Sequence, residues 1–242
     1  MIQHLSIHLN DDTRFMLPYL KRALPGVIID EHGNCSKTDF AVLLSSTDIY
    51  RHGQICDADE NEATDPRCKF FSEEKEFAAW VAKENVHAVI LRCTDIIGTG
   101  MTGFPRELAN SIWRGTFFHF PGNDAKRSTI HANDVAGFIA ALAEKFDGNR
   151  GSAEIFNITD GSNPTVHNLA EALAYRMNNK RISTLSTRPQ QWIGRFVYGK
   201  QKYESYTNTR TFSNAKVLKV SQYSPTAVCE YLRTHIYDES SL

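Results

Sequence analysis

The sequence predicts an α/β protein with an open parallel sheet and helices on both faces. Short apolar runs alternate along the chain with amphipathic segments of helical period. The run FAVLLSS, residues 40–46, is apolar almost throughout, which is typical of a parallel strand covered on both faces. The run VHAVILR, residues 86–92, has the same character, and a helical segment separates the two.

The N-terminal elements follow in order. QHLSIHL, residues 3–9, is the first expected strand. A helix is expected through RFMLPYLKRAL, residues 14–24, with DDT before it as N-cap residues. Pro18 lacks a backbone donor, so we expect this helix to begin late or to bend. VIID, residues 27–30, is a short buried strand, and the polar residues 51–68 are expected to form a surface loop.

Helices and strands keep alternating in the rest of the chain. AEIFNIT, residues 153–159, is expected to be a strand. We expect Asn133 and Asp134 to cap the helix that they open, and Thr165 to cap the next one. The expected helices are residues 72–85, 105–115, 133–146, 165–177 and 226–236.

Composition argues against several classes of function. The 242 residues carry a net charge of −1 without a basic stripe, so we expect neither nucleic acid nor an anionic membrane as partner. The longest apolar runs have strand length, and MIQHLSIHLNDD lacks the pattern of a signal peptide, so we expect a cytoplasmic protein. The 5 cysteines and 9 histidines show neither CxxC nor HExxH spacing, and we expect no metal site.

Four motifs occur in a fixed order: LLSSTDIY, FSEEKEFAAWV, ILRCTDIIGTG and KRSTIHANDVAGFIAAL. They resemble the SS-x-x-x-Y, Y-x-x-x-K, L-R-P-x-x-x-Y-G-P-G and R-D-x-I-H-V-x-D-V-A motifs of the extended short-chain dehydrogenase/reductase family. Its members are NAD-dependent epimerases and dehydratases of nucleotide sugars. The resemblance covers about residues 40–177. It implies a Rossmann-like fold, an NAD or NADP cofactor and a nucleotide-sugar substrate.

The resemblance also implies a division of the chain into two parts. Residues 1–160 would form a reduced Rossmann-like domain of the NAD(P)-binding type, with about residues 100–128 contributing to the substrate lobe. Residues 161–242 would form a small α+β subdomain of the substrate-binding type. The aromatic residues of this part would form its core or stack on a nucleotide; they are Trp192, Phe196, Tyr198, Tyr203 and Tyr206.

The cofactor half departs from the family pattern. The family's first turn is G-x-x-G-x-x-G, whose glycines let the backbone approach a pyrophosphate. No glycine occurs between residues 9 and 17 here, and Asp11 and Asp12 place negative charge at this turn. This argues against cofactor binding. The family positions for the cofactor are Thr13, Arg14, Asp30, Lys75 and Cys93.

Only residues 32–39 separate VIIDE from FAVLLSS, where the family has a helix, a strand and another helix. We therefore expect a smaller sheet with the VIID strand near an edge. In an alternative alignment the N-terminus begins later in the family pattern, so that the first strand is missing as well.

The catalytic positions are partly replaced. The family's tyrosine is a general acid/base assisted by a lysine four residues later; Phe71 stands in its place, and Lys75 remains. A shift by one residue gives Phe70 and Glu74 instead. The catalytic positions that remain are Ser46 or Thr47, for the family's hydrogen-bonding Ser/Thr, and Lys75.

The substrate positions are Arg127 and Asp95. Arg127 matches an arginine that contacts the diphosphate of a nucleotide sugar, and its planar fork suits that role. The alternative is a salt bridge to Asp134 or Asp124. Asp95 occupies a position where the family often has an asparagine that touches the substrate.

These features leave three functions open. The first is a catalytically impaired family member that binds a nucleotide sugar or a protein partner in a sugar or polysaccharide pathway. The second is an active NAD(P)-dependent epimerase, dehydratase or reductase. The third is a purely structural or interaction protein. We also expect a homodimer, because a shortened sheet leaves an edge free for pairing.

Overall fold

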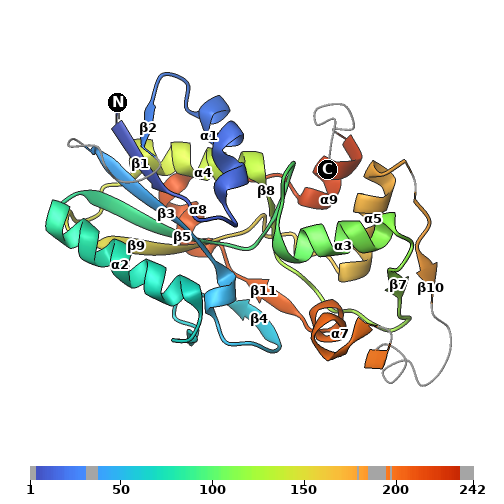
Figure 1. Cartoon of the computed structure of the whole chain (residues 1–242). Helices are drawn as coiled ribbons and strands as arrows, with labels where there is room; N and C mark the ends of the chain where they lie inside the picture. The colour runs from blue at the N-terminus through green and yellow to red at the C-terminus, as the bar shows by residue number, and fades with distance from the viewer. Residues whose placement is uncertain (1–3, 31–37, 179, 185–194, 197, 235–242) are drawn as a thin grey trace.

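The computed structural model describes residues 4–30, 38–178, 180–184, 195–196 and 198–234, apart from the side chains of residues 28 and 30 (Figure 1). A parallel sheet with the strand order β2-β1-β3-β5-β9 organises one half of the molecule. Its strands are β1 (His4–His8), β2 (Ile28–Asp30), β3 (Phe40–Ser46), β5 (His87–Cys93) and β9 (Ala153–Ile158).

Strand β1 lies between β2 and β3. The chain adds β2 on one side of β1 and then crosses over to add β3, and after it β5 and β9, on the other side. In an open α/β sheet this reversal marks the place where ligands bind. Strand β2, the VIID segment, lies at the edge, as predicted. The position of β1 between β2 and β3 is the one that the first of the two alignments gives it. The fold is Rossmann-like, with a sheet shortened on the β2 side.

Helices cover both faces of the sheet. One face packs against α1 (Leu17–Ala23), α4 (Ala132–Lys145) and α8 (Ala215–Ser221). The other face packs against α2 (Lys69–Glu84). The polar and apolar residues of HLSIH alternate, and its apolar side faces α1 and α4. On the α2 side, the ring of His8 packs against Trp80 with centroids 4.9 Å apart.

The start of α1 explains how a proline fits into this segment. A short 3-10 helix, η1 (Arg14–Met16), precedes α1, and Pro18 falls in the first turn of α1. The amide that proline lacks would have no partner within the helix at this position. The expectation of a late start is therefore confirmed.

Helix α4 is capped differently from the prediction. His131 is the N-cap residue, and its Nδ1 accepts a hydrogen bond of 3.2 Å from the backbone N–H of Asn133. The Asp134 carboxylate instead accepts from the Tyr223 hydroxyl and from the backbone N–H of Thr226. The predicted cap role of Asn133 and Asp134 is therefore wrong, because both side chains have partners in the C-terminal segment.

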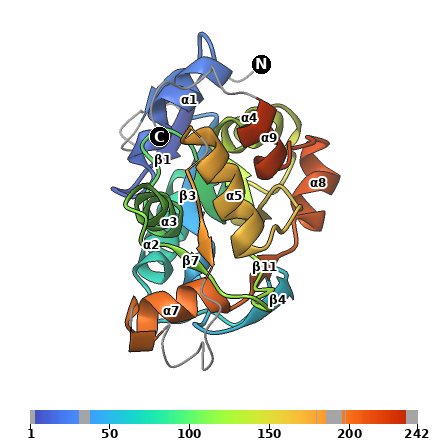
Figure 2. The same cartoon turned by 90° about the vertical axis from the view of Figure 1, so that its right-hand side faces the viewer.

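A second group of helices forms the other half of the molecule. Figure 2 looks onto this group with α5 in front. Thr165 caps α5, as predicted, by accepting from the backbone N–H of Asn168. Tyr203 and Tyr206 are buried in this half, whereas Trp192 lies outside the described residues. The elements are α3 (Gly103–Trp113), α5 (Val166–Arg176), α7 (Lys200–Thr207), α9 (Val228–Thr234), and the paired strands β7 (Phe118–His119) and β10 (Ser183–Thr184).

Two small strand pairs connect the halves. Strand β6 (Asp95–Ile97) pairs with β8 (Thr129–His131). Strand β4 (Ile55–Ala58) pairs with β11 (Arg210–Phe212). The prediction of an irregular loop over residues 51–68 missed β4, because its partner lies far away in the sequence. A second short helix, η2 (Thr47–Ile49), follows β3.

Among the described residues, no helix is long and apolar enough to cross a membrane. In the same part of the chain, no group of three or more His, Cys, Asp or Glu side chains is arranged to hold a metal ion. The division into residues 1–160 and 161–242 stays a prediction.

Candidate functional site

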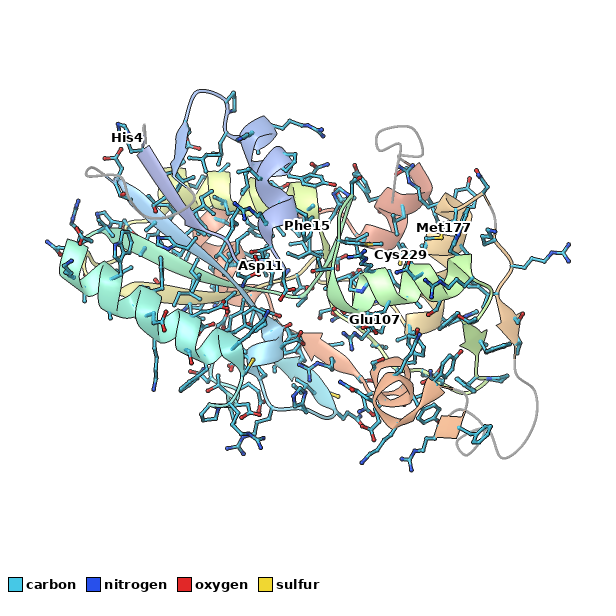
Figure 3. The ribbon with its side chains drawn as sticks, viewed as in Figure 1. His4, Asp11, Phe15, Glu107, Met177 and Cys229 are labelled. Carbon is cyan, nitrogen blue, oxygen red and sulfur yellow. The ribbon has the colours of Figure 1, made fainter. Side chains whose placement is uncertain are left out.

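The carboxyl ends of β1, β3 and β5 meet the start of α3. Figure 3 labels Asp11 and Phe15 in the segment that joins β1 to α1, where the sheet faces α3. Two cavities lie here, one of about 200 Å³ and one of about 30 Å³. They adjoin, because both are lined by Ser46, Asp48, Thr94 and Asp95. The site thus lies at the sheet's reversal point, where a parallel sheet places its ligands.

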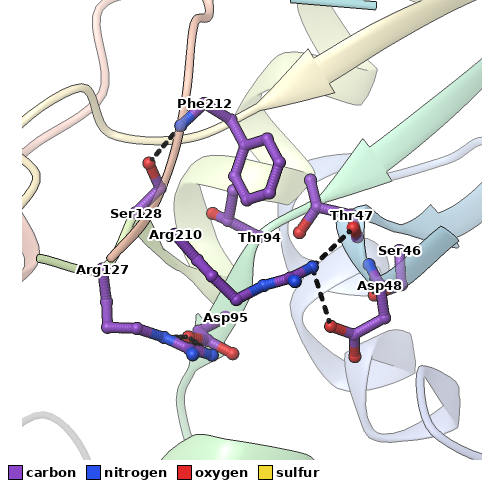
Figure 4. A pocket seen from close by; sticks show the side chains of 9 residues that line it. All are labelled: Ser46, Thr47, Asp48, Thr94, Asp95, Arg127, Ser128, Arg210 and Phe212. Atoms are coloured by element: carbon purple, nitrogen blue, oxygen red, sulfur yellow. Dashed lines mark hydrogen bonds and ion pairs between the residues drawn. The ribbon is translucent and has the colours of Figure 1, made fainter. Parts of the chain in front are cut away.

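Arg127 and Asp95 form an ion pair in the smaller cavity (Figure 4). The Asp95 Oδ2 atom lies 2.8 Å from Arg127 Nε and 2.7 Å from Nη2. The guanidinium carbon also lies 3.9 Å from the ring centroid of Phe104. Burial raises the pKa of Asp95, and the charge of Arg127 acts in the opposite direction. The predicted salt bridge of Arg127 to Asp134 or Asp124 is wrong, since Asp95 is the partner.

Arg210 is a second arginine of the smaller cavity, and sequence reasoning missed it. Its Nη2 donates to the backbone carbonyl of Thr47 at 3.2 Å and lies 3.7 Å from Asp48 Oδ1 (Figure 4). Burial lowers the pKa of Arg210, an effect that the charge of Asp48 opposes. A backbone bridge between Arg127 and Arg210 holds the two residues side by side. No local signal marks Arg210, because its position depends on the pairing of β11.

The turn after β1 lines the larger cavity, where the family would place a pyrophosphate. The Asn10 side-chain oxygen accepts from the backbone N–H groups of Asp12 and Thr13, both at 3.1 Å. The Asn10 backbone N–H donates in turn to Thr13 Oγ1 at 3.0 Å. These amides are used within the turn and are not offered to a phosphate. The turn therefore lacks both the glycines and these two donors.

An ion pair and a hydrogen bond of Asp12 join the elements that line the larger cavity. Lys69, at the start of α2, forms an ion pair with Asp12. Thr102, just before α3, donates from Oγ1 to the Asp12 backbone carbonyl at 3.0 Å. The β1–α1 turn is thus tied to both helices that border the cavity.

Helix α2 turns a different face to the site than the family motif implies. Lys75 is exposed, and its Nζ lies 4.4 Å from the ring centroid of Phe71. Neither residue is among those that line the two cavities. Phe70 lines the larger cavity, and Glu74 is buried one turn further along. The register shifted by one residue therefore describes the side of α2 that faces the sheet.

Glu74 belongs to a buried polar network across the sheet. Its two oxygens accept from Arg92 Nε at 2.9 Å and from Nη2 at 2.8 Å, and Ser45 donates to Oε1 at 2.7 Å. The Tyr50 hydroxyl lies 3.1 Å from Arg92 Nη1 and donates to Asn157 Oδ1 at 2.6 Å. Ser45, Arg92 and Asn157 occupy one row of neighbouring strands. Tyr50 is fully buried and serves as a structural member of this network.

Four further predicted site residues line one or both of the two cavities. Thr13 and Cys93 line the larger cavity, and burial raises the pKa of Cys93 to about 12, which keeps the thiol protonated at neutral pH. Ser46 Oγ accepts from the Asp48 backbone N–H, and the buried Thr47 lines the smaller cavity.

Two further positions lie apart from the cavities or outside the described side chains. Arg14 is exposed on η1 and lines neither cavity. Asp30 ends β2, and its side chain lies outside the described part. The structure therefore brings together Thr13, Ser46, Thr47, Cys93, Asp95 and Arg127 at the two cavities.

The sequence model of the NAD dependent epimerase/dehydratase family matches residues 35–159, slightly more than half of the chain. The chain belongs to this family. The match includes β3, α2, β5, α4 and β9, and with them most of the residues that line the two cavities. A search of curated protein sequences finds none that matches this family member.

Solved structures of similar fold span nearly the whole chain. The UDP-N-acetylglucosamine 4-epimerase from Bacillus cereus is 11% identical, with a TM-score of 0.66, and the match covers 96% of this chain and 94% of the other. RMD from Pseudomonas aeruginosa, complexed with NADPH, is 14% identical, with a TM-score of 0.64 and 96% of both chains covered. MoeE5 in complex with UDP-glucose and NAD is 15% identical, with a TM-score of 0.63 and 97% of both chains covered. At these identities the likeness shows the fold.

Proposed function

We propose that this family member binds a nucleotide sugar through its diphosphate and has lost nicotinamide-dependent turnover. The observation on which this depends is the convergence of two largely buried arginines, Arg127 and Arg210, on one narrow cavity. Two guanidinium groups side by side match the charge and the geometry of a diphosphate. The family and the UDP-glucose complex of MoeE5 support the same ligand class.

The diphosphate competes with the carboxylates that hold the arginines now. Asp95 bonds Arg127, and Asp48 lies beside Arg210. Asp48 is largely exposed and lies 3.7 Å from Arg210, so it gives up this arginine readily, whereas Asp95 is confined. Binding therefore replaces the carboxylate partners of the two arginines by phosphate oxygens, which accept hydrogen bonds from the same guanidinium N–H groups.

The loss of turnover is proposed from three features of the larger cavity and of α2. Asn10 uses the backbone N–H groups of Asp12 and Thr13, so the turn does not fit a dinucleotide pyrophosphate. Phe70 lines the cavity where the site-facing side of α2 would need a proton donor, and a phenyl ring has no proton to transfer. Lys75 lies on the exposed side of α2, away from both cavities.

The test is a thermal-shift panel of UDP-, GDP- and dTDP-glucose together with NAD and NADP. A ligand at one hundred times its dissociation constant stabilises the folded state by about 2.7 kcal/mol. We expect a shift with at least one nucleotide sugar and none with NAD or NADP alone. A shift with NAD or NADP together with turnover would support the active-enzyme alternative. No shift with any ligand would support a purely structural or interaction protein.

Variants of the arginines show whether the binding uses this site. Each charge-assisted hydrogen bond contributes about 1.5–3 kcal/mol, so Arg127→Met or Arg210→Met should weaken binding by at least about tenfold. Arg106→Met is the matched control, because Arg106 is exposed on α3 and lines neither cavity. Equal affinity of the control and of both cavity variants would place the ligand elsewhere.

We also propose a homodimer. In the described part of the sheet, β2 has a neighbour on one side only, and an open strand edge favours pairing. Light scattering on a size-exclusion column tests this directly. A particle of 27.4 kDa, the mass of one chain, would contradict it.

A further inference from the structure

The two cavities place the ligand's sugar next to its diphosphate. Both guanidinium groups line the smaller cavity, and four residues are shared with the larger one. A diphosphate between Arg127 and Arg210 therefore directs one of its two substituents into the larger cavity. At about 200 Å³, that cavity is below the roughly 300–1,000 Å³ of drug-sized ligand pockets and has the size for one sugar ring.

The walls of the larger cavity suit a sugar ring. Phe15, Phe70 and Phe104 supply aromatic surface, which packs against the C–H face of a pyranose. Asp48 and Asp95 supply carboxylate oxygens, which accept hydrogen bonds from sugar hydroxyl groups.

The charges at this cavity are mainly negative. Among the described residues that line it, Asp12, Asp48 and Asp95 are acidic and Lys69 is basic. When the diphosphate binds Arg127 and Arg210, its oxygens share the guanidinium charge that now faces Asp95 and Asp48. A carboxylate on the sugar would therefore be repelled by the acidic side chains of this wall. Lys69, the one basic residue among the described residues that line the cavity, is already paired with Asp12.

From this charge pattern we propose that the site accepts a hexose without an acidic group and rejects a uronic acid. The inference rests on the proposed function, since it concerns the sugar of the same ligand. It separates this chain from the UDP-glucuronic acid 4-epimerase of Bacillus cereus, whose fold is similar and which has been seen with UDP-glucuronic acid and NAD.

Titration calorimetry tests the selectivity directly. UDP-glucose and UDP-glucuronic acid, or the matching pair on whichever base binds, differ only at C6 of the sugar. We expect the glucuronic acid form to bind at least about tenfold more weakly. Equal or tighter binding of the glucuronic acid form would overturn this inference and leave the proposed function standing. Failure of UDP-, GDP- and dTDP-glucose alike would overturn the proposed function and this inference together.

Asp12→Asn identifies the residue responsible. The Asp12 side chain is half exposed and pairs with Lys69, so the variant frees an ammonium group at the cavity without opening the core. We expect Asp12→Asn to bind the glucuronic acid form more tightly. The ratio of the affinities for the glucose and glucuronic acid forms should fall by at least about threefold. Asp11→Asn is the matched control: it removes the same charge from the neighbouring exposed residue, which does not line the cavity. An equal effect of the two variants, or no effect of Asp12→Asn, would overturn the assignment to this wall.

Discussion

Replacing Glu74 by glutamine should destabilise the fold strongly, because it leaves a buried guanidinium without its counter-charge. The side chains of Arg92 and Glu74 are only 5% and 8% exposed, and two hydrogen bonds of 2.9 and 2.8 Å join them. Burial lowers the pKa of Arg92, but the hydrogen bonds and charge of Glu74 raise it by more, so the arginine stays charged. The substituted side chain would keep the shape of the carboxylate and place an amide donor against another donor.

The expected loss is about 3–5 kcal/mol, which is typical when one partner of a buried ion pair is removed. The whole free energy of unfolding of a domain is roughly 5–15 kcal/mol, so Glu74→Gln should lower the urea midpoint by a large fraction. Glu76→Gln on the same helix is the control, since Glu76 is exposed and its change should stay within about 0.5 kcal/mol.

A double variant separates charge from packing. Replacing both residues, with Glu74→Leu and Arg92→Met, removes the two charges together, and well-packed apolar replacements of buried pairs are often neutral or better. We expect the double variant to be more stable than Glu74→Gln, although the Tyr50 and Ser45 hydroxyl groups each lose one partner. A loss below about 1 kcal/mol for Glu74→Gln would refute the reasoning, because it would mean that water replaces the missing carboxylate.

Three further outcomes are expected. Gly98→Ala should cost about 1–3 kcal/mol in urea unfolding, because an added Cβ would lie 2.8 Å from the Tyr19 hydroxyl; an unchanged midpoint would contradict this packing. Phe71→Tyr should give no NAD-dependent turnover in a nicotinamide absorbance assay, since Phe71 lines neither cavity; measurable turnover would show that the α2 register is wrong. Burial raises the pKa of Asp134 above 3.8, so the folded protein holds this proton more tightly than the unfolded chain does. The resulting gain in unfolding free energy is fully present below pH 3.8 and is lost as the pH rises through the raised pKa of the folded state. Asp134→Asn should reduce the slope of the unfolding free energy against pH in this range, measured by urea unfolding. An unchanged slope would contradict the role of Asp134.

The strands and helices of the core could be predicted from their apolar periods. FAVLLSS and HAVILRC are apolar on both faces and became central strands, β3 and β5. The alternation in HLSIH shows in the sequence that this strand has one apolar face. The short segment between VIIDE and FAVLLSS also predicted that β2 would lie at an edge.

The site was predicted only in part. Asp95 and Arg127 were named from their motifs, but their mutual ion pair was not, since residues 32 positions apart give no pairing signal in one sequence. Arg210 was missed because the pairing of β11 with β4 brings it to the cavity. Lys75 was named from the resemblance to the family's Y-x-x-x-K motif, and its position on α2 leaves it on the solvent side.

The sequence by itself determined the family, the alternation of strands and helices, and the absence of glycine from the first turn, because these depend on residue types at short spacing. The tertiary structure decided which charges meet. Arg127 faces Asp95, Arg210 lies by Asp48, and Lys69 bonds Asp12 through contacts between elements that are distant along the chain. A residue type fixes the charge it can carry, but only packing fixes the distance to its partner, and the strength of an ion pair depends on that distance and on burial.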